Sequence, residues 1–387
     1  MLGGLSTDAF LRRHWQKRPL LVRQALPGFK GIATPAELAG LACTDGVNSR
    51  LVMERGGDYP WQARNGPFTA GDLRRLPLSN WTLLVTDIDR HLRAGADLVE
   101  RFRFLPSWRV DDLMISYAVP GGSVGPHTDS YDVFLLQARG RRRWQINHRR
   151  YRDDDCIPGL DLRILAQFEP AEEWIVEPGD LLYLPPDMAH YGVALDECMT
   201  CSIGFRAPTQ RELLKAWCDH AAGTLDPARR YADPDLRRQG NAGEIDGRAR
   251  RRIRDLIRSV PRGDADIDDW FGRFITETGP WQPPPPPSRP MTRARFLATF
   301  ARTGHLYRDD RSRFAWIRRG AAATLYVDAA AYPLSRRATF AAPLLAGQRE
   351  FSHAELAARL GNEEFVTLLL ALRNRGHLSF RRQLCYR

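Results

Sequence analysis

The fold and the chemistry of this chain are decided by one stretch, Gly125-Pro126-His127-Thr128-Asp129-Ser130-Tyr131-Asp132-Val133-Phe134-Leu135-Leu136, which Gly140-Arg141-Arg142-Arg143-Trp144 follows. The apolar run Val133 to Leu136 predicts a strand that extends back to His127. Residues two apart on a strand point to the same face. We therefore expect the side chains of His127 and Asp129 to project together.

An imidazole beside a carboxylate is two thirds of a common iron site. With a second imidazole, the pair forms the face that binds Fe(II) and leaves coordination positions open for substrates. His190, in Leu184-Pro185-Pro186-Asp187-Met188-Ala189-His190, is the candidate for that second imidazole. Without further support, an isolated His-x-Asp is more often an ordinary hydrogen-bonded pair beside a turn.

Arg142 supplies that support. On the strand predicted from Arg141 to Ile146, alternation places Arg142 on the same face as Trp144 and Ile146. An arginine on an aromatic, apolar face is expected inside, where a guanidinium needs an anionic partner. Its planar fork suits a carboxylate held through two hydrogen bonds. Beside Fe(II), the natural anion is the distal carboxylate of 2-oxoglutarate; the alternative is a solvated basic hairpin.

These residues resemble the JmjC-type 2-oxoglutarate oxygenases. Within that class, the opening stretch is similar to the bacterial ribosomal oxygenases, which hydroxylate an arginine of large-subunit ribosomal protein L-sixteen. The N-terminal segment fits the same group, with Phe10-Leu11-Arg12-Arg13-x-Trp15-Gln16-Lys17-Arg18-Pro19-Leu20-Leu21. The resemblance covers most of the first two hundred residues closely and the remainder by architecture.

The resemblance implies a set of roles for named residues. It makes His127, Asp129 and His190 the catalytic iron ligands, with 2-oxoglutarate and molecular oxygen as cosubstrates. Arg142 would hold the distal carboxylate of 2-oxoglutarate, and Ser116 would add a hydroxyl from a neighbouring strand. The implied substrate is an arginine of a large-subunit ribosomal protein. The densest acidic region, Asp153 to Asp155 with Glu169, Glu172 and Glu173, would suit that cation, although acidic loops are usually just solvated.

Short strands separated by Gly and Pro turns dominate the first part of the chain. No helices alternate with them, which favours an antiparallel double-sheet jelly roll over a parallel sheet. We therefore expect residues 1–207 to form a mainly β catalytic domain, a double-stranded β-helix of the cupin and JmjC kind.

Helical patterns follow. Residues 208–282 carry apolar side chains at spacings of three and four, and such a stripe must be buried against something. The resemblance suggests a second subunit and thus a homodimer; packing within the chain is the alternative. The proline run of residues 283–287 predicts a stiff linker over 283–290. Residues 291–387 then show helix, helix and strand, as in a winged-helix α+β domain.

Composition narrows the class of protein. The chain has 387 residues and a net charge of +11. Residues 1–207 hold 25 basic and 26 acidic side chains, whereas 208–387 hold 32 and 20, so the basic excess lies outside the predicted catalytic domain. That excess could meet an RNA-rich partner, but only three of the 57 basic residues are lysines, which indicates compositional bias and leaves nucleic-acid binding open. Neither a signal peptide nor a membrane-spanning run is evident, so we expect a cytoplasmic protein.

Other functions fit parts of the pattern. The same iron chemistry could hydroxylate histidine or asparagine or demethylate lysine, because the substrate pocket is spread over loops. A cupin-like barrel without catalysis could bind the ribosome or nucleic acid through its basic C-terminal half, although retention of all three ligands with Arg142 argues against it. A zinc hydrolase is more remote, since two histidines and a carboxylate also suit zinc.

Overall fold

The structure is a computed structural model that describes residues 1–387 apart from 57–60, 161, 239, 261–262, 279–283 and 383–387. The described chain divides into two compact units, Met1–Ala207 and Pro208–Arg382. Each unit is described by itself below. No helix among the described residues is both long and apolar enough to cross a membrane.

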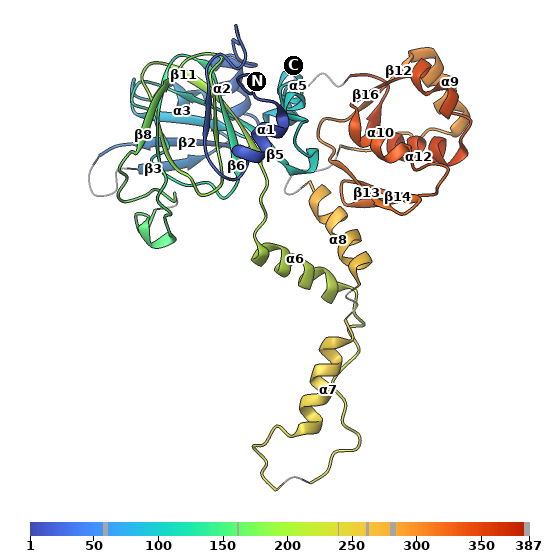
Figure 1. The fold of residues 1–387 in the computed structure, drawn as a ribbon. Coiled ribbons are helices and arrows are strands. Elements are labelled where there is room, and N and C mark those ends of the chain that lie inside the picture. Colours follow the sequence, from blue (N-terminus) through green and yellow to red (C-terminus); the bar gives the residue numbers. More distant parts are fainter. Residues whose placement is uncertain (57–60, 161, 239, 261–262, 279–283, 383–387) are drawn as a thin grey trace. The chain divides into compact units, whose positions relative to one another are not determined.

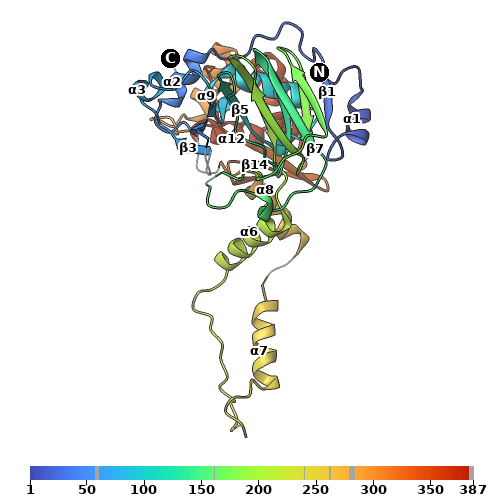
Figure 2. The ribbon, with the colours of Figure 1, turned by 90° about the vertical axis from the view of Figure 1, so that its left-hand side faces the viewer.

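Two antiparallel sheets build the N-terminal unit (Figures 1 and 2). The larger sheet has eight strands in the order β1-β9-β6-β11-β5-β4-β2-β3, and the smaller has three in the order β10-β7-β8. This arrangement confirms the predicted jelly roll. The strands are β1 (Leu20–Val22), β2 (Ser49–Glu54), β3 (Trp61–Asn65), β4 (Trp81–Val85), β5 (Val110–Ala118), β6 (Asp132–Arg139), β7 (Arg142–Asn147), β8 (Glu172–Val176), β9 (Leu181–Leu184), β10 (Ala189–Ala194) and β11 (Cys198–Phe205).

Alternation along the strands separates two apolar cores. On β6, Val133 and Leu135 pack with Trp144 and Ile146 of β7 in a cluster that the two sheets share. Phe134 and its neighbours on the other face join a larger cluster with the N-terminal helices. Strand β7 is alternately buried and half-buried, with Arg142, Trp144 and Ile146 inside, as predicted from the sequence.

The predicted strand beginning at His127 is wrong in its extent. Strand β6 starts only at Asp132, and His127 takes part in an isolated bridge to His190 instead. Gly125, with a φ of +80°, turns the chain just before His127. His127 and Asp129 therefore lie on a loop, and their convergence does not come from strand alternation.

Short helices cover the outer face of the large sheet. The first, α1, begins after Ser6, whose hydroxyl accepts a hydrogen bond from the backbone N–H of Ala9. The second begins at Pro35 after the N-cap Thr34, which forms a capping box with Glu37 of the first turn. The helices are α1 (Thr7–Arg13), α2 (Pro35–Ala42), α3 (Ala70–Arg74), α4 (Ile88–His91) and α5 (Arg93–Val99), with 3-10 turns at Glu100–Phe102, Ser107–Arg109 and Asp153–Asp155.

The second unit begins with three helices, α6 (Gln210–Gly223), α7 (Gly247–Arg258) and α8 (Asp264–Thr276). Helix α8 buries Trp270 and Ile275. Helix α7 buries none of its residues, and Ile253 and Ile257 are 45% and 57% exposed. The predicted apolar stripe of this region is therefore left uncovered on α7.

The rest of this unit mixes helices with two three-stranded antiparallel sheets, β16-β12-β17 and β13-β14-β15. Phe296, Leu325, Phe351 and Leu369 belong to its core. Pro283, where the predicted proline linker starts, lies outside the described residues. The elements are α9 (Arg293–Thr303), β12 (His305–Arg308), β13 (Phe314–Arg319), β14 (Ala322–Val327), β15 (Ala330–Leu334), α10 (Ala341–Gly347), β16 (Glu350–Ser352), α11 (His353–Leu356), a 3-10 turn (Ala357–Arg359), α12 (Glu363–Asn374) and β17 (Leu378–Ser379).

Candidate metal centre

Three side chains predicted as metal ligands lie together at one place in the N-terminal unit. One donor atom from each of His127, Asp129 and His190 lies within 4.8 Å of the others. The Asp129 carboxylate is 3.9 Å from Nε2 of His127 and 3.6 Å from Nε2 of His190. The two imidazole rings are 4.2 Å apart between centroids. These distances leave a shared point that one cation could occupy.

The backbone holds this geometry. The N–H of His127 donates to the carbonyl of His190 at 3.0 Å, and the reverse bond measures 2.9 Å. The N–H of Asp187 donates to the carbonyl of Asp129 at 2.7 Å. Strand β10, which carries His190, is thus fixed to the loop that carries the other two donors.

Both imidazoles present the same nitrogen to the centre. Nδ1 of His127 lies 2.9 Å from the carbonyl oxygen of Gly125, and Nδ1 of His190 lies 2.9 Å from that of Met188. A proton on Nδ1 satisfies each carbonyl and leaves the Nε2 lone pair free, which is how metal-binding histidines are usually oriented. Burial, followed by the nearby His127, lowers the pKa of His190 to about 4. His190 is therefore a neutral donor near pH 7.

Tyr131 is a further member of the centre that the sequence analysis gave no role. Burial, followed by the Asp129 charge, raises the pKa of its hydroxyl, which lies near that carboxylate. A phenol that stays protonated can only donate toward that carboxylate, so its proximity favours one orientation of Asp129. Its position two residues after Asp129 was the available signal.

Arg142 is buried with an exposure of 5%, and Ser116 with 3%. Nη1 of Arg142 lies 3.4 Å from the Ser116 hydroxyl, and the guanidinium stands 5.5 Å from the Trp144 ring centroid. Within the described part of the chain, Nε and Nη2 of Arg142 have no hydrogen-bond partner. A buried cation with open donors calls for an anion.

The donor set and the cation together fit a metal with an anionic cosubstrate. Two imidazoles and one carboxylate suit Fe(II) and leave coordination positions open. The unsatisfied fork of Arg142 suits one carboxylate of a dicarboxylic acid. The sequence-predicted residues are thus brought together in two groups, the three donors and the Arg142–Ser116 pair.

A second carboxylate approaches Tyr131 from β5. Asp112, Met114 and Ser116 alternate along this strand and share one face. A Cβ atom built on Gly204 would lie 3.3 Å from Oδ1 of Asp112 and 3.6 Å from the Tyr131 ring, so both lie above this glycine. Burial, followed by the charges of Asp111, Asp87 and Asp89, raises the pKa of Asp112 well above its usual range. A cation placed there would offset that cost.

Three protein-family models match parts of this chain. The family model for the JmjC domain matches residues 97–213, and that for the ROXA-like winged helix matches residues 253–379, which confirms the winged-helix prediction. An AraC-like ligand binding domain model matches residues 167–268.

Two curated relatives are similar over much of the chain. The ribosomal protein uL16 3-hydroxylase of Escherichia coli is 39% identical over 289 residues, which are 74% of this chain and 76% of the relative. A probable ribosomal oxygenase of Haemophilus influenzae is 37% identical over 62% of this chain and 57% of the relative.

Two solved structures are similar to this chain over nearly its whole length. The X-ray structure of Escherichia coli ycfD matches with a TM-score of 0.84 and 34% identity, covering 97% of this chain and 98% of the other. A structure of the ribosomal oxygenase YcfD in complex with cobalt and 2-oxoglutarate matches with a TM-score of 0.80 and 33% identity over the same shares.

Proposed function

The chain belongs to the family of JmjC-domain ribosomal oxygenases, and on that premise we propose that it hydroxylates an arginine side chain of ribosomal protein uL16, the L-sixteen protein of the large subunit. It is an oxygenase that uses Fe(II), 2-oxoglutarate and molecular oxygen. The observation that carries the proposal is the convergence of His127, Asp129 and His190 within 4.8 Å.

These three residues would hold the iron. When bound, iron with 2-oxoglutarate supplies the oxidising power that inserts oxygen into an unactivated C–H bond. The side chains have narrower tasks. His190 stays neutral because it is buried, and the Nδ1 hydrogen bonds of both histidines keep their Nε2 atoms aimed at the metal. The Tyr131 hydroxyl lies near the Asp129 carboxylate and would favour one orientation of it.

Arg142 would bind the distal carboxylate of 2-oxoglutarate. Its Nε and Nη2 are free among the described residues, and they are the two donors that a bidentate carboxylate needs. Ser116 adds a hydroxyl beside Nη1. Trp144 shields the guanidinium from water, which strengthens the ion pair that forms on binding.

Asp112 would recognise the substrate guanidinium. It lies on the same face of β5 as Ser116, four residues away, so roughly 13 Å separates their Cα atoms. The Tyr131 ring, over which an arginine could stack, lies near Asp112 and near the Asp129 ligand. A carboxylate that becomes charged when a guanidinium binds beside it favours arginine over the neutral asparagine considered above.

The acidic loop contributes less to this pocket. Asp155 accepts a hydrogen bond from the Arg152 backbone at 2.7 Å, Glu172 pairs with His148 at 2.7 Å, and Glu173 accepts from Gln145 at 2.6 Å. The Asp153 side chain lies outside the described residues. Because these carboxylates have local partners, charge reversal in the loop should disturb turnover less than replacement of Asp112.

We also infer that the protein is a cytoplasmic homodimer. Because ribosomes assemble in the cytoplasm of a bacterium, an enzyme that acts on a ribosomal protein is expected to work there. The uncovered apolar residues Leu214, Ile253 and Ile257, with exposures of 60%, 45% and 57%, give α6 and α7 a surface that a second copy could bury. Sedimentation velocity of the full chain against an Ile253→Glu, Ile257→Glu variant tests this, and a wild-type monomer would contradict it.

The function is tested by loading the protein with Fe(II) and 2-oxoglutarate under anaerobic conditions and then admitting oxygen in the presence of ribosomes. Mass spectrometry should find one added oxygen atom on an arginine of uL16, with one succinate formed per product. An oxygen on a histidine or asparagine instead would reject the substrate assignment. Formation of neither product nor succinate would reject the activity.

A further inference from the structure

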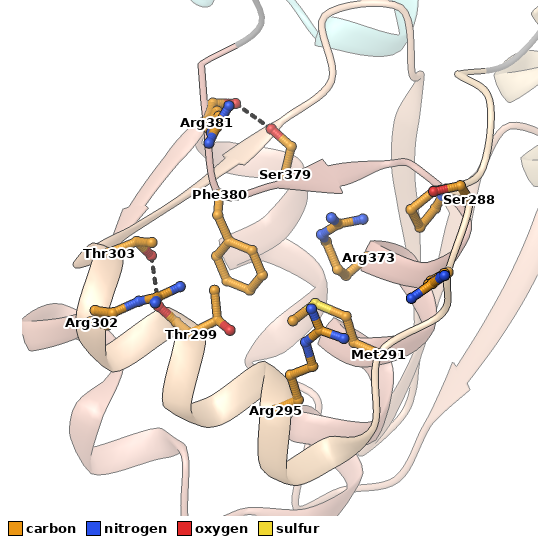
Figure 3. Close-up of a pocket in the computed structure, with 12 residues that line it drawn as sticks. Ser288, Met291, Arg295, Thr299, Arg302, Thr303, Arg373, Ser379, Phe380 and Arg381 are labelled. Carbon is orange, nitrogen blue, oxygen red and sulfur yellow. Dashed lines mark hydrogen bonds between the residues drawn. The ribbon is translucent and has the colours of Figure 1, made fainter.

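A cavity of about 550 Å³ opens in the second unit between α9, the end of α12 and the chain around β17 (Figure 3). It belongs to the winged-helix part of the chain and shares no residue with the metal centre. Five of its lining residues are arginines, at positions 289, 295, 302, 373 and 381. The lining also includes hydroxyl side chains and Phe380 but no carboxylate.

The arginines of this cavity differ from others nearby. Arg293, also on α9, pairs with Glu363 at 3.3 Å, and Arg375 donates to the hydroxyl of Tyr332 at 3.1 Å. In contrast, none of the five lining guanidiniums forms an ion pair with a described residue. Their mutual repulsion is therefore not offset from within the described chain, which indicates that an anion belongs there.

Arg373 makes this point most clearly. It is half-buried, and its Nε has no hydrogen-bond partner within the described residues. Burial lowers the pKa of its guanidinium, with no carboxylate acting against that shift. A half-buried guanidinium whose Nε has no hydrogen-bond partner costs stability. A ligand with several charged oxygens would satisfy it and the exposed arginines around it.

Phe380 suggests what else the ligand carries. Its ring packs against Phe296 and Phe300 of the core, with centroids 5.5 and 6.4 Å away. It also stands 5.6 Å from the Arg373 guanidinium carbon and lines the cavity (Figure 3). An aromatic ring among arginines is the usual platform for an unpaired base, with the guanidiniums on the adjacent phosphates. An acidic peptide would use the cations but has no need of the ring.

We propose that this arginine-lined cavity binds a segment of single-stranded RNA, with its phosphates on the arginines and a base stacked on Phe380. A planar guanidinium matches two phosphate oxygens at once. Base stacking requires an unpaired strand, which excludes a duplex. RNA is the polyanion that accompanies a ribosomal protein substrate, so the choice of RNA over DNA rests on the proposed function.

The test is fluorescence anisotropy of a labelled single-stranded RNA of about ten nucleotides, mixed with the full-length chain. An Arg295→Ser, Arg302→Ser variant removes two lining charges. Its matched control is Arg336→Ser, Arg337→Ser, which removes two exposed arginines of the same unit that do not line the cavity. We expect affinity to fall at least about tenfold in the cavity variant and to stay unchanged in the control.

Salt dependence and stacking provide independent readouts. Loss of two phosphate contacts should reduce the slope of log affinity against log salt by about 1.4. Phe380→Leu should weaken binding and leave that slope unchanged, because it removes stacking and no charge. Thermal unfolding of each variant checks that the unit is folded.

Several outcomes would overturn the proposal. They are equal losses in the cavity variant and its control, tighter binding of duplex DNA than of the single strand, equal binding of single-stranded DNA, and displacement of the RNA by an acidic peptide at equal charge. Hydroxylation of a uL16 peptide should be unchanged in the cavity variant. Failure of RNA binding with intact hydroxylation would therefore reject this proposal alone.

Discussion

His127 and His190 are joined by two backbone hydrogen bonds, in which the N–H of each donates to the carbonyl of the other, at 3.0 and 2.9 Å. The Nδ1 atoms of both rings face carbonyls as well, so neither imidazole depends on a metal for its orientation. The centre is therefore preorganised, and residues that touch the donors should affect metal affinity more than folding.

Tyr131 is the first such residue. Tyr131→Phe removes the hydroxyl near the Asp129 carboxylate and keeps the ring, so we expect metal affinity to fall about tenfold with little change in the thermal midpoint. Titration with Co(II), followed by its absorption spectrum, measures this. Tyr151→Phe, which alters a half-buried loop residue beside Arg149, serves as the control, and equal cobalt affinity in the two variants would refute a role for Tyr131.

Arg142 should determine the affinity for 2-oxoglutarate. Arg142→Met loses a buried charge pair worth about 2–5 kcal/mol, so KM for 2-oxoglutarate should rise at least about 30-fold. Arg142→Lys keeps the charge but loses the planar fork of donors, so its KM for 2-oxoglutarate should lie between those of the wild type and Arg142→Met. Because the free protein buries this cation unpaired, Arg142→Met should also raise the thermal midpoint without ligand. An unchanged KM would disprove the clamp.

Replacement of Asp112 should change the kinetic constants for the peptide substrate and not those of peptide-free turnover. Asp112→Asn is expected to lower kcat/KM for an arginine peptide by at least about tenfold, which corresponds to about 1.4 kcal/mol. Succinate formed slowly without peptide should continue, since the metal and Arg142 are untouched. Asp97→Asn is the control, because Asp97 pairs with Arg93 at 3.0 Å on α5 and is not among the charges that raise the pKa of Asp112. A parallel loss of peptide-free turnover would mean that Asp112 is structural.

The pH dependence should follow the raised pKa of Asp112, which burial and then the charges of Asp111, Asp87 and Asp89 produce. Below that pKa the side chain is neutral and cannot pair with a guanidinium. KM for the peptide should therefore fall as the pH rises through the raised value. Peptide-free succinate formation corrects for titration of the centre itself. This pH dependence of KM should vanish in Asp112→Asn. If it persists there, the titrating group is another residue.

The sequence predicted some features because they follow from strand periodicity. Arg142, Trp144 and Ile146 share a buried face, as alternation requires. The same rule failed at His127, where Gly125 and Pro126 turn the chain and no ladder begins before Asp132. Strand alternation predicted that His127 and Asp129 lie together, and they do. The cause is different, because an isolated bridge between His127 and β10 brings the donors together.

Other features depend on contacts that no local pattern contains. Strand β10 was not predicted, since Pro185 and Pro186 suggest only a turn and Gly192 is a weak strand residue. There a Cβ would lie 2.5 Å from the Trp144 ring, so glycine is needed for packing that the sequence cannot show. Similarly, Arg373 and Arg375 look alike in sequence, yet only Arg373 lines the cavity.

The central claim is that His127, Asp129 and His190 hold the iron that hydroxylates uL16. It is tested most directly by hydroxylation of a uL16 peptide together with Co(II) binding, for Asp129→Ala and His190→Ala. His148→Ala is the control, since this exposed histidine pairs with Glu172. We predict that both ligand variants lose product and cobalt binding while the control keeps both. Wild-type hydroxylation by either ligand variant would contradict the account.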